Sequence, residues 1–299
     1  MPETWSHPSS PEEMARALER VAYFADEPIA TACFLALKMR RPLFCEGEAG
    51  VGKTSLARAV AQALDCPIFR LQCYEGLTAS EALYDWDFPR QLLHLRAAAS
   101  LDDSSRERLE ADLYDRRFLL RRPILRAFEA GGGVLLIDEV DRADAEFEAF
   151  LLEALSEFSV TIPELGTITA EVPPFVVVTS NRTREVHDAL KRRCLYHWID
   201  YPTFDRELAI VRRRFPRMPE TLAQQVASAT GRLRHADLIK PPGVAETLDW
   251  SEALNALNVT ELTSGAISLT LGALVKYKED QARLRKDDFS LLMSPSHKS

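Results

Sequence analysis

The stretch FCEGEAGVGKTSLARAV, residues 44–60, places three glycines and a lysine between an apolar run and a helical pattern. The apolar run before the turn predicts a short strand, and the spacing of apolar residues after it predicts a helix. Glycine permits backbone angles that other residues resist, so Gly47, Gly50 and Gly52 let main-chain N–H groups point inward at one ligand. A turn of this kind is typical of a phosphate-binding loop.

The turn also carries a specific pattern. Gly47, Gly52, Lys53 and Thr54 fit G-x-x-x-x-G-K-[ST] without a mismatch. In this pattern backbone N–H groups and the positive end of the helix hold phosphates, the lysine reaches the outer phosphates, and the hydroxyl ligates Mg²⁺. We therefore expect ATP and Mg²⁺ as ligands, rather than a flexible turn with an exposed lysine. The predicted nucleotide-binding residues are Gly47, Glu48, Ala49, Gly50, Val51, Gly52, Lys53, Thr54 and Ser55.

A second motif, VLLIDEVD at residues 134–141, is a continuous apolar run that ends in two acids. Such a run predicts a strand covered on both faces, and ligands of open α/β sheets bind at the carboxyl ends of the strands. We expect Asp138 to hold the magnesium with Thr54, and Glu139 to orient or deprotonate an attacking water. Without other evidence, two adjacent acids at the end of a strand more often belong to a solvated turn. Because the chain also has a phosphate loop, we favour the magnesium and water roles instead.

Further downstream, FVVVTSNRT at residues 175–183 predicts another buried strand, and Asn181 at its end has an amide that suits a γ-phosphate or the attacking water. Arg192 and Arg193 follow at a predicted helix end. They either cap that helix and pair with acids, or project into a neighbouring subunit's nucleotide as an arginine finger.

Composition limits the classes of function. The 299 residues carry 37 Lys and Arg against 45 Asp and Glu, a formal charge of -8, which argues against a surface built to bind nucleic acid. We see neither an apolar run of membrane-spanning length nor a signal peptide, so we expect a cytoplasmic protein. The five cysteines show no metal-ligand spacing and are expected to be buried free thiols.

The pattern along the chain predicts an α/β fold with a central parallel sheet flanked by helices, followed by a smaller all-helical domain. We expect residues 90–122 to be charged and helical, and residues 160–172 to form a hairpin. The predicted division is a polar segment at 1–17, the α/β domain at 18–203, a helical lid domain at 204–280 and a flexible tail at 281–299.

Taken in order, these motifs resemble an AAA+ ATPase. ALKRRCLYHWIDYP (189–202), IPELGTITA (162–170) and RRPILRAFEAGG (121–132) are similar to the MoxR-like branch, closest to its carbon monoxide dehydrogenase maturation members. The resemblance implies a ring, expected to be a hexamer, that works with a von Willebrand A domain partner. It further implies a chaperone that remodels a client metalloenzyme and assists assembly of its metal cofactor.

By position, the resemblance matches Asp138 and Glu139 to the Walker B pair, Asn181 to sensor 1, and Arg193, with Arg192 second, to the arginine finger. One departure concerns the lid. Where many relatives have an arginine that touches the γ-phosphate, PPGVAETLDW (241–250) has Glu246 and Thr247, so sensing is either absent or done by Arg232 or Arg234.

Two other functions compete with the remodelling ATPase. A P-loop kinase would pass the γ-phosphoryl group to a small metabolite through the same loop, but Glu139 favours water as the acceptor. A DNA-remodelling motor is disfavoured by the net charge.

Overall fold

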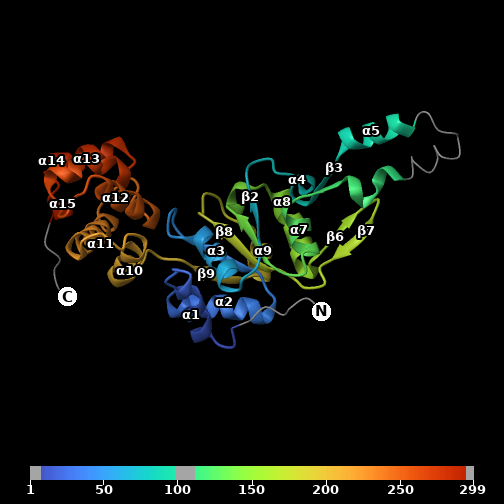
Figure 1. Ribbon diagram of the computed structural model, residues 1–299, viewed down its shortest axis with the longest axis horizontal. Helices are drawn as coiled ribbons and strands as arrows, with labels where there is room; N and C mark the ends of the chain where they lie inside the picture. Colours follow the sequence, from blue (N-terminus) through green and yellow to red (C-terminus); the bar gives the residue numbers. More distant parts are fainter. Residues whose placement is uncertain (1–7, 99–111, 294–299) are drawn as a thin grey trace.

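The computed structural model describes residues 8–98 and 112–293, and a five-stranded parallel sheet lies at its centre (Figure 1). The strand order is β2-β5-β8-β1-β9, so consecutive strands are separated by crossovers. The expected central parallel sheet is confirmed. Its strands are β1 (Leu43–Glu46), β2 (Ile68–Gln72), β5 (Val134–Asp138), β8 (Phe175–Ser180) and β9 (Leu195–Trp198).

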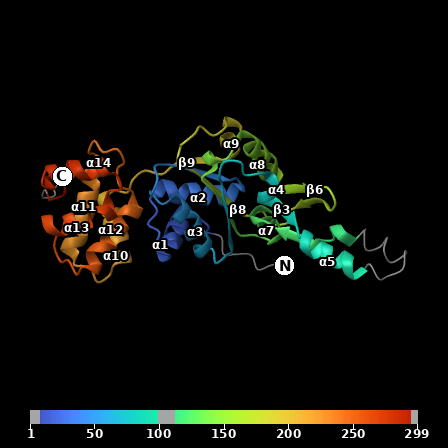
Figure 2. The ribbon, with the colours of Figure 1, turned by 90° about the horizontal axis from the view of Figure 1, so that it is seen from above.

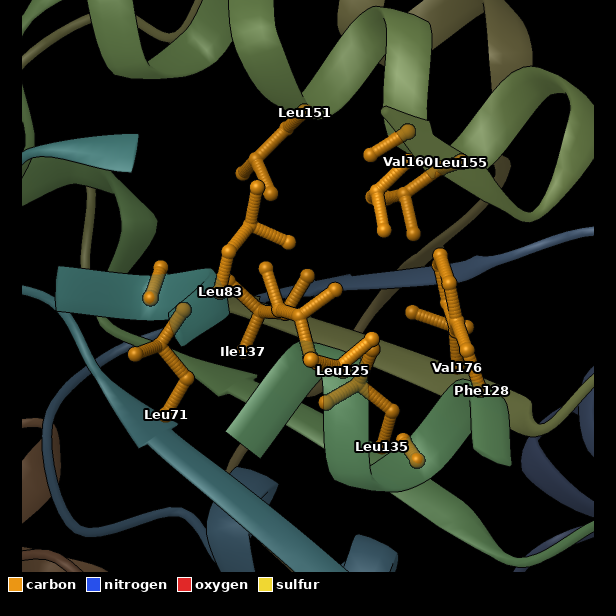
Figure 3. Packing of buried hydrophobic residues seen from close by; sticks show 14 of the residues in the cluster. Leu71, Leu83, Leu125, Phe128, Leu135, Ile137, Leu151, Leu155, Val160 and Val176 are labelled. Carbon is orange, nitrogen blue, oxygen red and sulfur yellow. The ribbon is translucent and has the colours of Figure 1, made fainter. Parts of the chain in front are cut away.

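Strand β5 shows why the sheet is covered on both faces. Successive side chains of a strand point to opposite faces. Val134 and Leu136 pack in one hydrophobic cluster and Leu135 and Ile137 in another, all fully buried. Figure 3 shows the second cluster, where Leu135 and Ile137 meet side chains of α7 and α8. A continuous apolar run is therefore favoured here, because an alternating one would bury polar side chains against one of the two layers of helices.

Helices cover each face of the sheet. One face packs α1 (Pro11–Arg20), α2 (Glu27–Met39) and α3 (Lys53–Ala63), and the other packs α7 (Pro123–Glu129), α8 (Ala145–Glu157) and α9 (Asp188–Arg193). Several of these helices begin at a side-chain cap. Ser10, Asp26 and Asp144 each accept a hydrogen bond from the backbone N–H three residues on, which satisfies a donor that the helix leaves free.

Two small antiparallel pairs lie at the end of the molecule away from the helical domain (Figures 1 and 2). The expected hairpin is confirmed as β6 (Ser159–Ile162) paired with β7 (Gly166–Thr169). The other pair is β3 (Tyr84–Trp86) with β4 (Leu119–Arg121). Short helical elements surround these strands: α4 (Ala79–Leu83), α5 (Phe88–Ala98), η1 (Asp112–Tyr114), η2 (Arg116–Phe118) and, beside the main sheet, η3 (Val140–Arg142).

The expectation that residues 90–122 are helical is wrong at their end, because Leu119–Arg121 is a strand. Its pairing partner lies more than thirty residues earlier, so no local pattern announced it. Part of the predicted region, residues 99–111, lies outside the described residues.

After β9 the chain is helical, and a third hydrophobic cluster forms there around Trp250 and Leu271. Its helices are α10 (Phe204–Arg214), α11 (Glu220–Arg234), α12 (Val244–Ala256), α13 (Ser264–Leu274), α14 (Lys278–Lys286) and α15 (Ser290–Met293).

Both predicted ends of the chain need correction. The tail expected from residue 281 is helical through Met293, and Leu284 and Leu292 are buried in the third cluster. The polar segment expected at 1–17 overlaps α1, which begins at Pro11 and buries Met14. In both places a few apolar side chains among many charged ones are enough to dock a helix. Within the described residues, none of the helices has the length and apolar character needed to cross a membrane.

Candidate nucleotide-binding site

The glycine turn links β1 to α3, as predicted, and residues 47–52 form its loop. Gly50 and Gly52 have φ of 81° and 100°, a region that side chains with a Cβ rarely adopt. Lys53 is 6% exposed, and its Nζ donates to the carbonyl oxygens of Gly47 and Glu48, at 2.7 Å each. Burial lowers the pKa of Lys53, while the nearby Asp141 opposes that shift. The lysine is thus folded back over its own loop.

Pairing between strands places the predicted polar residues along one edge of the sheet. Gln72 on β2 lies opposite Asp138 on β5, and Ser180 on β8 lies opposite Glu46 on β1. Because all of these residues end parallel strands, their side chains meet at the carboxyl edge, next to the glycine loop. The strand before Asn181 therefore lies beside the strand that leads into the glycine loop.

Asp138 is the most tightly bonded carboxylate at this edge, with a side chain only 3% exposed. Its Oδ1 accepts hydrogen bonds from the hydroxyls of Thr54 at 2.9 Å and Thr179 at 2.6 Å. Its Oδ2 accepts two from Arg70, from Nε at 3.0 Å and Nη2 at 2.7 Å. The predicted pair Thr54 and Asp138 is therefore brought together, and an unpredicted arginine joins it.

Glu139 lies beside Asp138 with φ of 57°, in the left-handed region. Its Oε2 accepts from Gln72 Nε2 at 3.0 Å and faces Arg142 Nε at 3.0 Å. The amide of Asn181 lies 3.4 Å from Oε1, and its backbone N–H donates to Asp141. Positive φ is uncommon outside glycine and costs energy, so the surrounding contacts must hold this residue in place.

A cavity of about 300 Å³ joins these groups. Gly50, Gly52, Lys53 and Thr54 line it from the loop and α3, and Asp138, Glu139, Thr179 and Asn181 line it from the strand ends. Its remaining wall is the start of α12 in the helical domain, where the side chains are apolar: Val244, Ala245 and Leu248. The cavity is thus bounded by both the α/β part and the helical part of the chain.

The start of α12 also bonds directly to the loop. The backbone N–H groups of Val244 and Ala245 donate to the carbonyl oxygen of Gly50, at 2.9 and 3.3 Å. Glu246 caps its own helix by accepting from the N–H of Gly243 at 2.9 Å. Movement of the helical domain is therefore coupled to the backbone of the phosphate loop without an arginine.

The idea that Arg232 or Arg234 senses the phosphate is not supported by their contacts. Arg234 forms a two-pronged ion pair with Glu207, and both side chains are almost fully buried. Arg232 donates to the carbonyl oxygens of Leu291 and Leu292 at the end of the chain. Both guanidinium groups are used in holding the helical domain together.

A second cavity of about 160 Å³ adjoins the first, since Gly52, Ser55, Val244 and Leu248 line both. Tyr23 and Arg206 line it as well. Among the described residues, Tyr23 OH and Arg206 Nε are the buried side-chain polar atoms that lack a hydrogen-bond partner. Burial raises the pKa of Tyr23, so its hydroxyl keeps its proton. Unpaired buried donors cost free energy and often mark a place that a ligand or water fills.

Arg192 and Arg193, at the end of α9, do not line either cavity. Both side chains are exposed. Arg193 Nη1 donates to Ser156 Oγ on α8 at 2.7 Å, and Arg41 holds the backbone carbonyls of both arginines. If they act on a nucleotide, it has to be the nucleotide of another copy of the chain.

Sequence reasoning missed four residues of the site: Arg70, Gln72, Thr179 and Arg142. Gln72 and Arg70 alternate with apolar residues in Ile68–Gln72, and this alternation is the signal that the sequence offers. Their importance depends on β2 being the neighbour of β5, and the order of strands is not written in any local pattern.

The glycine loop, the threonine and aspartate, and the second acid next to an asparagine define a nucleoside-triphosphate-hydrolysing site of the P-loop class. A family model described as AAA domain (dynein-related subfamily) matches residues 42–194, half of the chain. The chain therefore belongs to this AAA family, and it is an ATPase. The resemblance to AAA+ ATPases and the predicted fold class are thus confirmed.

Relatives found by comparison are distant. An uncharacterized protein of Staphylococcus saprophyticus is 21% identical over 215 residues, which is 70% of this chain and 74% of that protein. One of Staphylococcus haemolyticus is 21% identical over 216 residues, with the same coverage. Among solved structures, the RuvB Holliday junction branch migration motor of Thermotoga maritima is 18% identical, with a TM-score of 0.45, over 89% of this chain and 72% of that chain.

An ATPase of this family uses ATP with Mg²⁺, and the donor set here suits both. Thr54 and Asp138 offer a hydroxyl and a carboxylate oxygen 2.9 Å apart, the hard ligands that Mg²⁺ prefers. In the part of the chain that the structure describes, no cluster of three His, Cys, Asp or Glu side chains could hold a metal alone. That agrees with Mg²⁺, which is commonly held by one or two protein groups and the phosphates.

Proposed function

We propose that the chain is a ring-forming, MoxR-like remodelling ATPase whose own residues bind ATP at the two adjoining cavities. The observation that carries this proposal is the single cavity lined by Lys53, Thr54, Asp138, Glu139 and Asn181. A phosphate-binding loop, a magnesium-type oxygen pair and an acid beside an amide are the groups that hydrolysis of a triphosphate needs.

In this proposal Lys53 leaves the carbonyls of Gly47 and Glu48 and, with the backbone N–H groups of residues 48–54, holds the phosphates. Thr54 and Asp138 hold the magnesium, which when bound neutralises charge on the outer phosphates. The base and ribose occupy the second cavity, where Tyr23 OH and Arg206 Nε lack partners. A triphosphate and its nucleoside thereby fill adjoining spaces.

Glu139 is proposed as the residue that orients water. Its Oε2 is already held by Gln72 and Arg142, whereas Oε1 has, among the described residues, only the longer contact from Asn181. Oε1 is therefore the oxygen with free capacity to accept a hydrogen from a water molecule. Asn181 is then close enough to position either that water or the γ-phosphate.

The first test is ATP binding and turnover by the wild type and two variants. Lys53→Ala is expected to lose nucleotide affinity, because it removes the positive charge that this proposal assigns to holding the phosphates. Glu139→Gln is expected to bind ATP as the wild type does and to hydrolyse it at least about 100-fold more slowly. Equal turnover by Glu139→Gln and wild type would refute this role of Glu139.

We further propose a homo-oligomeric ring, a hexamer, in which Arg193, or else Arg192, reaches the nucleotide of the next subunit. Members of this family commonly form rings. Support from the structure is the exposure of both arginines and their distance from the chain's own cavities. The kinase alternative is not carried forward, since the family model that matches residues 42–194 is an AAA domain.

The finer role that we propose is assembly of the metal cofactor of carbon monoxide dehydrogenase, with a von Willebrand A domain protein as partner. Its support is the similarity of residues 121–132, 162–170 and 189–202 to MoxR-like proteins. The test is the molybdenum and copper content of the client enzyme, co-expressed with the partner and either wild type or Glu139→Gln. Equal metal content in the two preparations would contradict this role and leave the ATPase assignment untouched.

A further inference from the structure

Arg70 occupies an unusual place for a cation. It lies on β2, the outermost strand of the sheet, and both its Nε and its Nη2 donate to Asp138 Oδ2. Asp138 is also the residue to which we assign the magnesium. The arginine side chain is 45% exposed, while the carboxylate that it contacts is 3% exposed. The guanidinium thus reaches from the solvent edge into a nearly buried acid.

The acid needs such a partner in the absence of a metal. A buried carboxylate without a counter-charge is costly, and removal of one partner from a buried pair is destabilising. Of the other cations of the site, Lys53 donates to two backbone carbonyls and Arg142 faces Glu139. Arg70 is therefore the cation in hydrogen-bonding contact with Asp138 among the described residues.

We propose that Arg70 is a built-in counter-cation for Asp138 that leaves the carboxylate when a divalent cation and nucleotide bind. The proposal rests on the assignment of Asp138 to magnesium given above. Two cations near one carboxylate repel each other, so the magnesium has to displace the guanidinium or bind more weakly. Arg70 can leave at low cost, since its side chain is half exposed and it also contacts Gln72.

If Arg70 is displaced in this way, its replacement should raise the affinity for the divalent cation and lower the stability of the ligand-free chain. Replacing Arg70 by methionine removes the competitor, so the apparent affinity for the divalent cation should rise, by about tenfold for a half-exposed charge pair. The same replacement leaves Asp138 unpaired in the ligand-free chain, so thermal stability without ligand should fall. Added cation and nucleotide should return the melting temperature to the wild-type value.

The experiment measures Mn²⁺ binding to the full chain in saturating ADP by electron paramagnetic resonance, for wild type and Arg70→Met. It also measures ADP affinity in EDTA and the melting temperature with and without Mn²⁺ and ADP. Arg126→Met is the matched control. Arg126 is an exposed arginine of α7 whose guanidinium lies over the ring of Phe69, the residue before Arg70 on β2. It should leave Mn²⁺ affinity unchanged.

Each outcome decides the proposal. Tighter Mn²⁺ binding by Arg70→Met, with ADP affinity in EDTA unchanged, supports displacement. Weaker ADP binding both with and without Mn²⁺ overturns it, since Arg70 would then be holding phosphate. Unchanged Mn²⁺ affinity also overturns it.

A second variant covers the case in which Arg70→Met does not fold. Arg70→Lys keeps the charge but cannot donate from two nitrogens of a planar group, so it should fall between wild type and methionine. If Lys53→Ala binds ADP as tightly as wild type, the proposed nucleotide site has failed, which is a separate result from the failure of the Arg70 exchange.

Discussion

The buried ion pair between Arg234 and Glu207 offers a sharp test of how the helical domain is held together. The two side chains are 4% and 1% exposed, and both nitrogen–oxygen distances are 2.6 Å. Thr247 donates to the same carboxylate at 2.7 Å, and Arg234 Nε donates to the carbonyl of Pro242. The pair joins α10, α11 and α12, the last of which contacts the phosphate loop.

Replacing Arg234 with methionine should cost about 3–5 kcal/mol, because it leaves the Glu207 charge buried without a partner. Arg212→Met is the matched control. Its ion pair with Glu220 is more than half exposed on both sides, so the cost should stay within about 1 kcal/mol. The assay is urea unfolding of wild type and both variants, followed by circular dichroism.

The double variant Arg234→Met with Glu207→Gln separates the two causes of such a loss. If the unpaired charge is what destabilises, the double variant should be more stable than Arg234→Met alone. The reasoning is refuted if Arg234→Met unfolds like the Arg212 control while its ATP affinity falls. Arg234 would then be acting on the nucleotide rather than on the packing of the helical domain.

Three further predictions follow from single positions. A Cβ at Gly243 would lie 2.8 Å from the carbonyl oxygen of Ala49 in the phosphate loop, so Gly243→Ala should weaken ATP binding, measured by calorimetry. In the control Gly231→Ala the new Cβ meets no atom within 4 Å, so this substitution should raise the free energy of unfolding by about 0.5–1 kcal/mol. Burial raises the pKa of Cys45 to about 12, so a thiol reagent at pH 8 should modify it at least about 100-fold faster after unfolding than before. Burial lowers the pKa of His197, so as the pH falls the imidazole takes up a proton in the unfolded chain before it does so in the folded one. The free energy of unfolding should therefore fall as the pH drops below about 6.5, and it should fall less steeply in His197→Gln. Wild-type behaviour in any of these variants, or a fast-reacting native Cys45, would count against the corresponding argument.

The parts of the fold that were predictable are those with dense local signals. The VLLID strand, the helix after the glycine turn and the AEFEAF helix each carry enough apolar residues at one spacing to identify themselves. Strand β4 and helix α14 carry few, and they are stabilised by partners distant in the sequence. Their structures therefore depend on tertiary packing, which no local pattern reports.

The residues of the site were likewise predictable where a local motif contains them and not where their role depends on neighbouring strands. Lys53, Thr54, Asp138, Glu139 and Asn181 were predicted because each stands in a motif at a strand end. Arg70 and Gln72 could not be predicted, because their role depends on β2 lying next to β5 and on where their side chains reach. The contacts of Arg234 do not support the sensor role considered for it, because its guanidinium is buried in an ion pair with Glu207.

In the proposed ring, ATP is hydrolysed between neighbouring copies of the chain, with Glu139 from one subunit and Arg193 from the next. The test mixes two variants, Arg193→Ala and Glu139→Gln, each of which is expected to be inactive alone. A mixed ring contains interfaces in which an intact Glu139 faces an intact Arg193, so the mixture should recover about a quarter of wild-type turnover. A mixture no more active than its separate components, with both variants still binding ATP and assembling, would contradict the claim.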